Sequence, residues 1–209
     1  MIKYPNGQAF EPVAQLKHEQ FVKAKQQKVV FGHRGMALED EINSSNEYYR
    51  NHDTAVVYKK PTPVQIVHVD YPKRAKAVIK EAYFRQPSTT DYNGVYQGRY
   101  LDFEAKETKN KRSFPLKNFH QHQIDHFKRC LKQQGICFVL VKFVAWERVF
   151  LYPATKLITA WEAQQQGGAK SIQLTEFEHH GYEIKYAIHP ILPYIQAVEQ
   201  LLDYLKESN

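Results

Sequence analysis

Residues 100–107 read Tyr100-Leu101-Asp102-Phe103-Glu104-Ala105-Lys106-Glu107, an alternation of apolar and charged side chains that predicts a β-strand. Successive side chains of a strand point to opposite faces, so Asp102, Glu104 and Lys106 share one face and the apolar residues share the other. The preceding block, residues 88–94, ends in Asn93-Gly94, a dipeptide that favours a tight hairpin turn. The two blocks therefore predict neighbouring antiparallel strands, with Asp91 just before the turn.

An acidic residue on one strand and Glu-x-Lys on the next is a pattern used by metal-dependent nucleases. Cutting a phosphodiester needs an activated water, charge stabilisation on the phosphate and a neutralised leaving oxygen, all of which divalent metals can supply. Magnesium prefers hard oxygen ligands, so Glu104 is predicted to hold a metal and Asp91 to reach the same ion. Lys106 is predicted to orient the water or to stabilise the transition state. Glu-x-Lys triplets are common by chance, and the pattern alone does not establish a nuclease.

A carboxamide occurs among apolar residues further along the chain. Phe114-Pro115 predicts the start of a long helix that ends at Gln134, with Gln123 on its apolar stripe. A buried amide costs free energy unless it has a hydrogen-bonding partner. A metal or its bound water is one possible partner for Gln123, and a backbone group is the ordinary alternative.

Histidines and cysteines on or near the same helix offer a second kind of metal site. Of His120, His122 and His126, only His122 and His126 lie one helical turn apart, and this pair lacks a nearby third ligand. We therefore predict that the three histidines are solvated or face DNA. Cys130 and Cys137 are the only two cysteines of the chain, which disfavours both a disulfide framework and a zinc site. A reducing, cytoplasmic location fits this cysteine content.

The net charge of +7 is unevenly distributed along the 209 residues. Residues 1–117 contain 20 Lys and Arg against 13 Asp and Glu, whereas residues 118–209 contain 9 of each class. A basic surface attracts polyanions, so the charge favours a nucleic-acid partner for the half that holds most of the predicted site. A basic protein without such a partner remains the alternative.

Strongly basic sequence surrounds a predicted projection at about residues 62–86. Thr54–Lys59 and Val64–Asp70 read as strands, and the prolines on both sides of the second strand indicate that it lies outside the core sheet. Phosphate contact is the functional interpretation, and a solvated charged face is the alternative. The candidate DNA contacts are Arg34, Lys59, Lys60, Lys73, Arg74, Lys76 and Lys80.

The remaining sequence predicts a single α/β domain at residues 34–209, preceded by a flexible basic arm at residues 1–33. Helices are expected at 38–49, 155–166 and 191–206 from their apolar spacing, and a buried strand at Ile136–Phe143 with a neighbour at Val149–Tyr152. Glu39 could reach the site, although an acid there is more often a helix-start charge. No apolar run is long enough to span a membrane, and the first residues do not resemble a signal peptide.

Several blocks together resemble a known family. They are Arg34-Gly35-Met36 with Leu38-Glu39, Lys59-Lys60-Pro61-Thr62-Pro63, Val69-Asp70-Tyr71-Pro72, residues 88–94, residues 102–108 and Ser113-Phe114-Pro115-Leu116. In this order they resemble the RecU-type Holliday junction resolvases of Gram-positive bacteria. The similarity is dense from residue 34 to 126, looser towards the C-terminus and close again in the first seven residues, while residues 8–33 have no clear match.

The resemblance implies a restriction-endonuclease-like α/β fold with a mixed sheet flanked by helices, and a homodimer. It implies a Mg²⁺-dependent cut of four-way junction DNA that leaves 5′-phosphate ends, with Mn²⁺ as a substitute. By position, the metal ligands would be Thr89, Asp91, Glu104 and Gln123, and Lys106 the transition-state stabiliser. The projection would be a stalk that reaches into the junction centre. RecA recombinase and a branch-migration helicase would be partners.

Two alternatives to junction resolution stay open at this stage. The first is a nuclease of the same fold with another substrate, such as a sequence-specific restriction enzyme. The basic projection argues against it, because selection by DNA shape and backbone charge needs few residues that read bases. The second is a DNA-binding or recombinase-regulating protein without catalysis, which the complete set of Asp91, Glu104 and Lys106 argues against.

Overall fold

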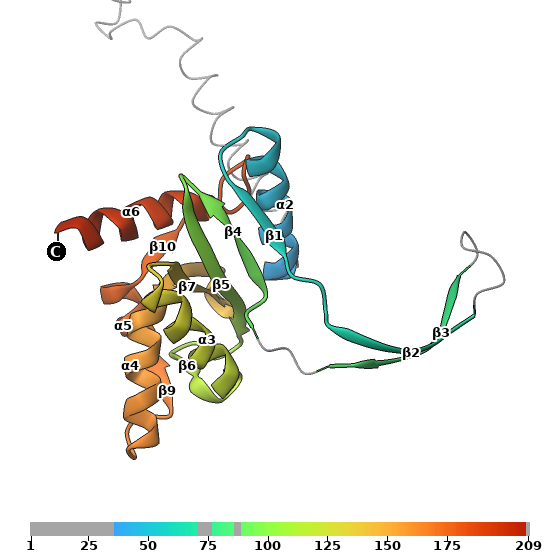
Figure 1. The fold of residues 1–209 in the computed structure, drawn as a ribbon. Helices are drawn as coiled ribbons and strands as arrows, with labels where there is room; N and C mark the ends of the chain where they lie inside the picture. The colour runs from blue at the N-terminus through green and yellow to red at the C-terminus, as the bar shows by residue number, and fades with distance from the viewer. Residues whose placement is uncertain (1–35, 71–76, 86–88, 208–209) are drawn as a thin grey trace, which may run out of the picture.

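The computed structural model describes residues 36–70, 77–85 and 89–207, and its centre is a six-stranded sheet (Figure 1). The strands follow in the order β1 (Val56–Lys59), β4 (Tyr92–Tyr96), β5 (Arg99–Thr108), β7 (Ile136–Phe143), β8 (Arg148–Pro153) and β10 (Tyr182–Ile184). Strands β5 and β7 are parallel, and the other neighbouring pairs are antiparallel. This mixed sheet flanked by helices confirms the predicted α/β class.

Helices cover both faces of the sheet. On one face lie α2 (Leu38–Asn51) and α6 (Tyr194–Glu207), and on the other lie α3 (Gln121–Lys132), α4 (Ala154–Gln165) and α5 (Leu174–His180). The predicted apolar spacing is confirmed in α2, where Leu38, Ile42 and Tyr49 are buried. The last helix begins at Tyr194, three residues later than expected. No helix in the described part of the chain has the length and hydrophobicity needed to cross a bilayer.

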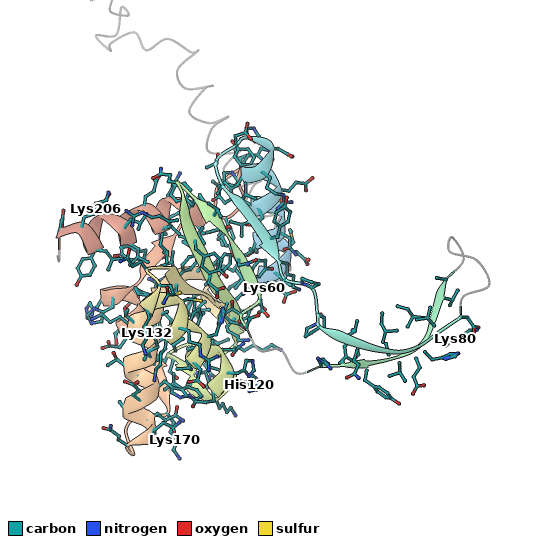
Figure 2. The ribbon with its side chains drawn as sticks, in the orientation of Figure 1. Lys60, Lys80, His120, Lys132, Lys170 and Lys206 are labelled. Atoms are coloured by element: carbon teal, nitrogen blue, oxygen red, sulfur yellow. The ribbon has the colours of Figure 1, made fainter. Side chains whose placement is uncertain are left out.

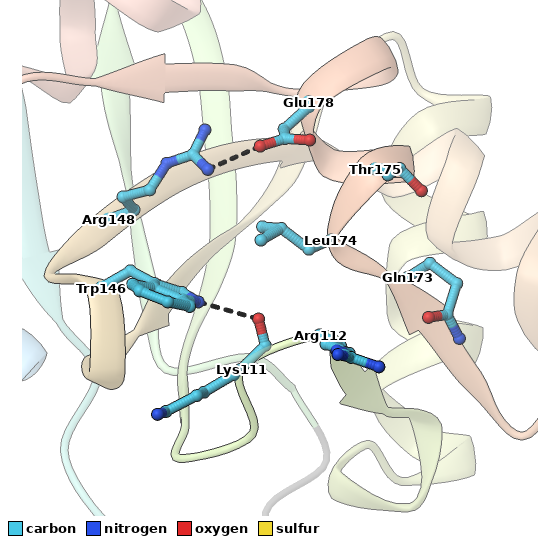
Figure 3. A pocket seen from close by; sticks show the side chains of 8 residues that line it. All are labelled: Lys111, Arg112, Trp146, Arg148, Gln173, Leu174, Thr175 and Glu178. Carbon is cyan, nitrogen blue, oxygen red and sulfur yellow. Dashed lines mark hydrogen bonds and ion pairs between the residues drawn. The ribbon is translucent and has the colours of Figure 1, made fainter.

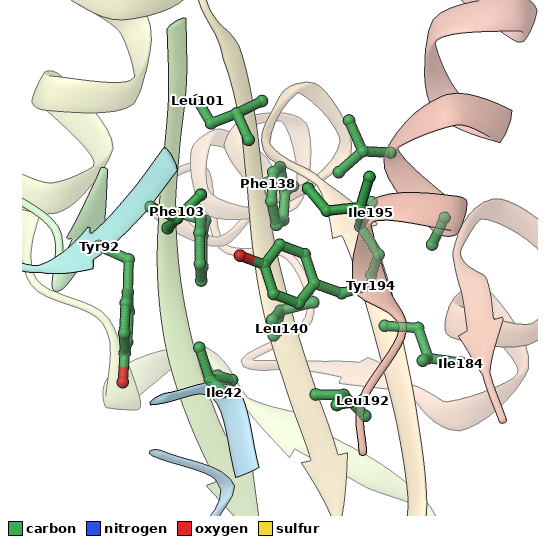
Figure 4. Packing of buried hydrophobic residues seen from close by; sticks show 14 of the residues in the cluster. Ile42, Tyr92, Leu101, Phe103, Phe138, Leu140, Ile184, Leu192, Tyr194 and Ile195 are labelled. Carbon is green, nitrogen blue, oxygen red and sulfur yellow. The ribbon is translucent and has the colours of Figure 1, made fainter. Parts of the chain in front are cut away.

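Strand β5 carries its apolar side chains into the α2/α6 face, as its alternation predicts. Phe103 stacks between Tyr92 and Phe138, with ring centroids 4.9 and 4.7 Å away, and the Tyr194 ring lies 5.3 Å from it (Figure 4). The opposite face of β5 carries Asp102 and Glu104, and both side chains are fully buried. The central strand therefore places carboxylates inside the layer that α3 covers.

Strand β7 is buried along its whole length, as expected for a strand with a parallel neighbour and helices on both faces. Phe138 and Leu140 belong to the cluster under α2 and α6. Val139 and Val141 belong to the cluster under α3, α4 and α5. The continuous apolar run predicted this strand with its observed bounds.

The hairpin turn lies further along the chain than predicted. Asn93-Gly94 lies inside β4, and the turn is formed by Gln97 and Gly98, whose φ angles are 47° and 73°. Asp91 therefore precedes the whole of β4 and not the turn. Gly94 is required for a different reason, since a Cβ there would lie 2.2 Å from the Val56 carbonyl oxygen of strand β1.

The long helix predicted from Phe114 also begins later. Residues Ser113–Pro115 form β6, which pairs with β9 (Ser171–Gln173), and a 3₁₀ turn follows at Leu116–Asn118. Helix α3 starts at Gln121. The short elements β9, α5 and β10 were absent from the prediction, because strands of three residues and a helix of seven have too few positions to show a period.

The projection consists of two strands outside the central sheet. Strand β2 (Val64–Asp70) pairs with β3 (Val78–Phe84), and both are almost wholly exposed. This hairpin extends away from the globular part (Figure 1), with Lys60 at its base and Lys80 towards its far end (Figure 2). The predicted contacts Arg34, Lys73, Arg74 and Lys76 lie outside the described residues, as does the predicted arm at 1–33.

Candidate active site

The carboxylate of Glu104 is the centre of the candidate site. It is fully buried, and its Oε1 accepts hydrogen bonds from Lys106 Nζ and from Gln123 Nε2, each at 2.6 Å. Its Oε2 accepts a bond of 3.1 Å from the backbone N–H of Asp91. Strand β5, helix α3 and the segment ahead of β4 thus meet at one side chain.

Gln123 is fixed by the start of its own helix. Its Oε1 accepts a 3.0 Å hydrogen bond from the backbone N–H of His120, the residue that precedes the first turn of α3. Its amide nitrogen then points to Glu104. The structure therefore gives the buried amide two partners, a backbone group and the carboxylate, whereas the sequence left a metal and a backbone group as alternatives.

Ionising Glu104 is costly in this environment. Burial raises the pKa of Glu104 to about 7, with the nearby Asp91 acting in the same direction and Lys106 opposing it. Two acidic residues and hard oxygen donors in one place form a set that suits a divalent cation, whose charge would favour the ionised form of Glu104. The residues present thus fit a bound metal.

The predicted metal ligands differ in how they are placed relative to Glu104. The half-buried Asp91 lies beside Glu104 at the entrance to β4. Thr89 is two residues earlier, and its hydroxyl donates to the Thr90 carbonyl oxygen at 3.3 Å. Gln123 presents nitrogen to the carboxylate, so a metal contact through its Oε1 requires rotation of the amide away from His120.

Similarity to known proteins identifies the family of the chain. The family model described as Recombination protein U matches residues 33–200. The chain belongs to the RecU family. A protein of Latilactobacillus sakei subsp. sakei (strain 23K), named Holliday junction resolvase RecU, is 59% identical over 204 residues, 95% of each chain.

Further relatives carry the same name. The protein of Lacticaseibacillus casei (strain BL23) is 57% identical over 202 residues, which are 97% of this chain and 95% of the relative. The protein of Lactobacillus delbrueckii subsp. bulgaricus (strain ATCC BAA-365 / Lb-18) is 55% identical over 209 residues, 100% of this chain and 99% of the relative. The family resemblance predicted from the sequence blocks is confirmed.

A second buried carboxylate, Asp102, lies next to Glu104 on the same face of β5. Its Oδ2 accepts hydrogen bonds from Lys60 Nζ at 2.9 Å and Tyr100 Oη at 2.8 Å, and lies 3.1 Å from His126 Nε2. Its Oδ1 accepts a hydrogen bond from the Thr90 hydroxyl. Strand alternation predicts that Asp102 lies on this face, but no role was predicted for it. Its position two residues before Glu104 was the signal that could have indicated a role.

The histidines of α3 differ from one another. These histidines were predicted to be solvated or to face DNA. His126 is partly buried against Asp102, which contradicts the first alternative for this residue, and a DNA contact stays a prediction. Burial lowers the pKa of His122, and the neighbouring His120 and Lys106 act in the same direction. The rings of His120 and His122 stack 5.5 Å apart at the helix start. His122 therefore lies within electrostatic reach of the candidate site.

Asp102, His126 and Cys130 bring potential ligand atoms within 4.8 Å of one another. The ammonium group of Lys60 already contacts the same carboxylate, and it supplies the positive charge that a metal would bring. Cys130 Sγ lies 3.5 Å from His126 Nε2. We interpret this cluster as a hydrogen-bonded network.

The described candidates for DNA contact fall into two classes. Lys59 and Lys80 are exposed, and each pairs with an exposed acid: Lys59 with Glu39 at 2.5 Å, and Lys80 with Asp70 at 3.4 Å. The Glu39 carboxylate is thus engaged in a surface ion pair. The ammonium of Lys60 is mostly buried and is engaged with Asp102. A DNA contact by Lys60 stays a prediction, and this bond competes with it.

A cavity of about 590 Å³ lies elsewhere, between the loop after β5 and α5 (Figure 3). Trp146 Nε1 donates to the Lys111 carbonyl oxygen at 2.9 Å, and Arg148 donates to Glu178 at 2.6 Å. The lining contains none of the predicted site residues. The residues lining it are Lys111, Arg112, Trp146, Arg148, Gln173, Leu174, Thr175 and Glu178. The cavity therefore does not form part of the carboxylate centre.

Proposed function

We propose that this chain is a metal-dependent endodeoxyribonuclease that resolves Holliday junctions by paired nicks in opposing strands during recombination and repair. The observation that carries the proposal is the buried Glu104 carboxylate, held by Lys106, by Gln123 and by the backbone of Asp91. The names of the RecU relatives supply the substrate class. Because junction DNA is that substrate, we place the enzyme in the bacterial cytoplasm.

Mg²⁺, or Mn²⁺ in its place, would be held by the Asp91 and Glu104 carboxylates, with Thr89 and Gln123 as further oxygen ligands. When bound, the metal activates water and neutralises charge on the phosphate. Gln123 orients Glu104 through its amide nitrogen, and its oxygen becomes available to a metal only when the amide turns away from the His120 N–H. The metal identity and the full ligand set are supported by the hard oxygen donors alone.

Lys106 is the residue we assign to transition-state stabilisation. Its ammonium lies 2.6 Å from Glu104 Oε1, and its side chain remains 23% exposed, so it contacts the carboxylate and is also accessible from solvent. A fixed cation at this place stabilises the negative charge that develops on the phosphate oxygens. The products would carry 5′-phosphate ends.

Junction selection is assigned to the exposed β2–β3 hairpin and its basic flanks. A four-way junction differs from a linear duplex in shape and in the density of phosphates, which a projecting basic element can contact without reading bases. Paired nicks on opposing strands require two active sites, so we infer a homodimer. RecA and a branch-migration helicase are proposed as partners on the resemblance alone.

Cleavage of an end-labelled four-way junction, beside a linear duplex of the same sequence, tests the proposal. We expect two symmetric nicks in the junction with Mg²⁺, none with chelator, and little cutting of the duplex. Equal cutting of both substrates would favour the nuclease with another substrate. Binding without cutting would favour the DNA-binding protein without catalysis.

The homodimer is tested separately by sedimentation equilibrium. A mass of twice 24.6 kDa is expected for the free protein, and a monomer at micromolar concentration would contradict it.

A further inference from the structure

We infer that Asp102, Lys60 and Thr90 form a clamp that positions the metal-binding segment Thr89–Asp91 against Glu104. The three residues hold both ends of the β2–β3 hairpin to strand β5, and none of them is required to touch the metal or the DNA. They are positioning residues, and the inference rests on the proposed function.

Asp102 is the fixed point of the clamp. Its carboxylate is fully buried on β5, and both oxygens are engaged, with the Thr90 hydroxyl on Oδ1 and Lys60, Tyr100 and His126 around Oδ2. A buried carboxylate is tolerated only when charge and hydrogen bonds compensate it. The number of partners leaves Asp102 little capacity to bind a metal, which argues for a positioning role.

Lys60 binds the segment Thr89–Asp91 through two different groups. Its Nζ donates to Thr90 Oγ1 at 2.9 Å, and its backbone N–H donates to the Asp91 carbonyl oxygen at 2.7 Å. Thr90 in turn is 3% exposed and donates to Asp102. The peptide between Thr90 and Asp91 is therefore held from both ends, next to the Asp91 N–H that binds Glu104.

Helix α3 makes a second pair of contacts with the same two carboxylates of β5. Gln123 donates to Glu104, and His126, three residues later on the helix, lies against Asp102, two residues earlier on the strand. Residues three apart share a helix face and residues two apart share a strand face, so the two links lie side by side. Asp102 thus fixes the position of α3 as well as that of the segment before β4.

The clamp also lies where the projection leaves the globular part. Lys60 lies at the base of the projection (Figure 2), directly before Pro61–Pro63 and β2. Thr90 comes after β3 and just before β4. One carboxylate on β5 therefore ties the two ends of the projection to each other and to the catalytic strand. Asp102 therefore fixes the position of the base of the hairpin relative to Asp91.

A hydroxyl series at Thr90 is the sharpest test. Thr90→Val removes the hydroxyl and keeps the shape, whereas Thr90→Ser keeps the hydroxyl. Asp102→Asn is the second variant, and Glu41→Gln is the matched control. Glu41 is an equally buried carboxylate, bonded to Lys142 at 2.6 Å on the opposite face of the sheet.

Three quantities are measured on the full chain: Mn²⁺ affinity without DNA by electron paramagnetic resonance, junction affinity in chelator, and the cleavage rate constant at saturating junction. We expect Thr90→Val and Asp102→Asn to weaken Mn²⁺ binding and cleavage by roughly 10- to 100-fold, as is usual when partners of metal ligands are removed. Thr90→Ser and Glu41→Gln should stay within about threefold of the wild type, well below that range. Junction affinity in chelator should change little in all four variants.

Three results would overturn the clamp. Wild-type Mn²⁺ affinity in Thr90→Val would show that the hydroxyl does not position the segment. Equal losses in Thr90→Ser and Thr90→Val would show that the hydroxyl is not the responsible group, and an equal loss in Glu41→Gln would point to general destabilisation. A wild-type protein that leaves junctions uncut would instead refute the proposed function, while the Mn²⁺ comparison would still decide the clamp.

Discussion

At the scale of single residues, the buried carboxyl of Glu104 makes the stability of the free protein depend on pH. Burial raises the pKa of Glu104 from 4.5 to about 7. A carboxyl whose pKa is higher in the folded than in the unfolded state binds more protons when folded. The contribution of Glu104 to the free energy of unfolding therefore falls as pH rises from about 4.5 to 7, and above this window its full cost is present.

Replacing Glu104 by Gln should remove this cost. In chelator at pH 8, we expect the free energy of unfolding of Glu104→Gln to exceed that of the wild type by at most about 3 kcal/mol, the equivalent of the pKa shift. At pH 4 the two proteins should be nearly equal, because Glu104 is protonated in both states of the wild type. Urea denaturation at the two pH values measures the difference, and a gain of the same size at pH 4 would contradict the explanation.

Lys106 allows a test of catalysis without loss of binding. We expect Lys106→Met to lower the cleavage rate constant by about 100- to 1000-fold, the usual effect of removing one group that stabilises developing charge. Junction affinity in chelator should remain, because many other cations are available to the phosphates. Lys132→Met, at the end of α3, is the control for loss of one positive charge. A parallel loss of affinity and rate would identify Lys106 as a DNA contact instead.

At the scale of elements, the strands around the site were predictable because their alternation or apolar content is visible in the sequence. The hairpin turn was not, since Asn93-Gly94 satisfies a turn and also satisfies the close approach of β4 to β1. The start of α3 was misplaced because Phe114 pairs with Ile172 across a large sequence separation. Long-range pairing of this kind leaves no local pattern.

The close approach at Gly94 gives an element-scale prediction. A Cβ at residue 94 would lie 2.7 Å from Val57 Cα as well as against the Val56 oxygen, both backbone atoms that cannot move alone. We expect Gly94→Ala to cost at least about 2 kcal/mol of stability by forcing β1 away from β4. Gly98→Ala, in open space at a φ of 73°, should cost only about 1 kcal/mol of backbone strain. Thermal or urea unfolding that ranks the two variants in reverse would exclude a steric role for Gly94.

The candidate site itself was predictable only in part. The positions of Glu104 and Lys106 follow from strand alternation, and the apolar stripe predicts a buried amide at Gln123. Its bond to His120 was not predictable, because the helix start was expected at Phe114 and lies at Gln121. Asp102 and Thr90 could not be assigned, because their role comes from Lys60, which is 42 residues from Asp102 in the chain and meets it only in the fold.

At the scale of the whole molecule, the concentration of positive charge in residues 1–117 predicts how junction affinity depends on salt. Removing one phosphate contact should lower the slope of log affinity against log salt by about 0.9. We expect replacement of Lys73, Arg74 and Lys76 by Ala to reduce that slope by about 2 to 3.

The matched control for this experiment removes three cations from the neutral half, Lys156, Lys170 and Lys206. Fluorescence anisotropy with a labelled junction at several salt concentrations measures both slopes. An unchanged slope in the first variant, or an equal change in the control, would exclude phosphate contacts by the projection.

The clamp at Asp102 has a consequence for how such enzymes diverge. A segment that leaves the globular part at Lys60 and returns at Thr90 has its two ends fixed together whatever its length. Lengthening a closed segment costs little, because loop entropy grows only with the logarithm of its length. We therefore expect that insertion or deletion between residues 61 and 88 would change the reach of the projection, while Asp91 keeps its position beside Glu104.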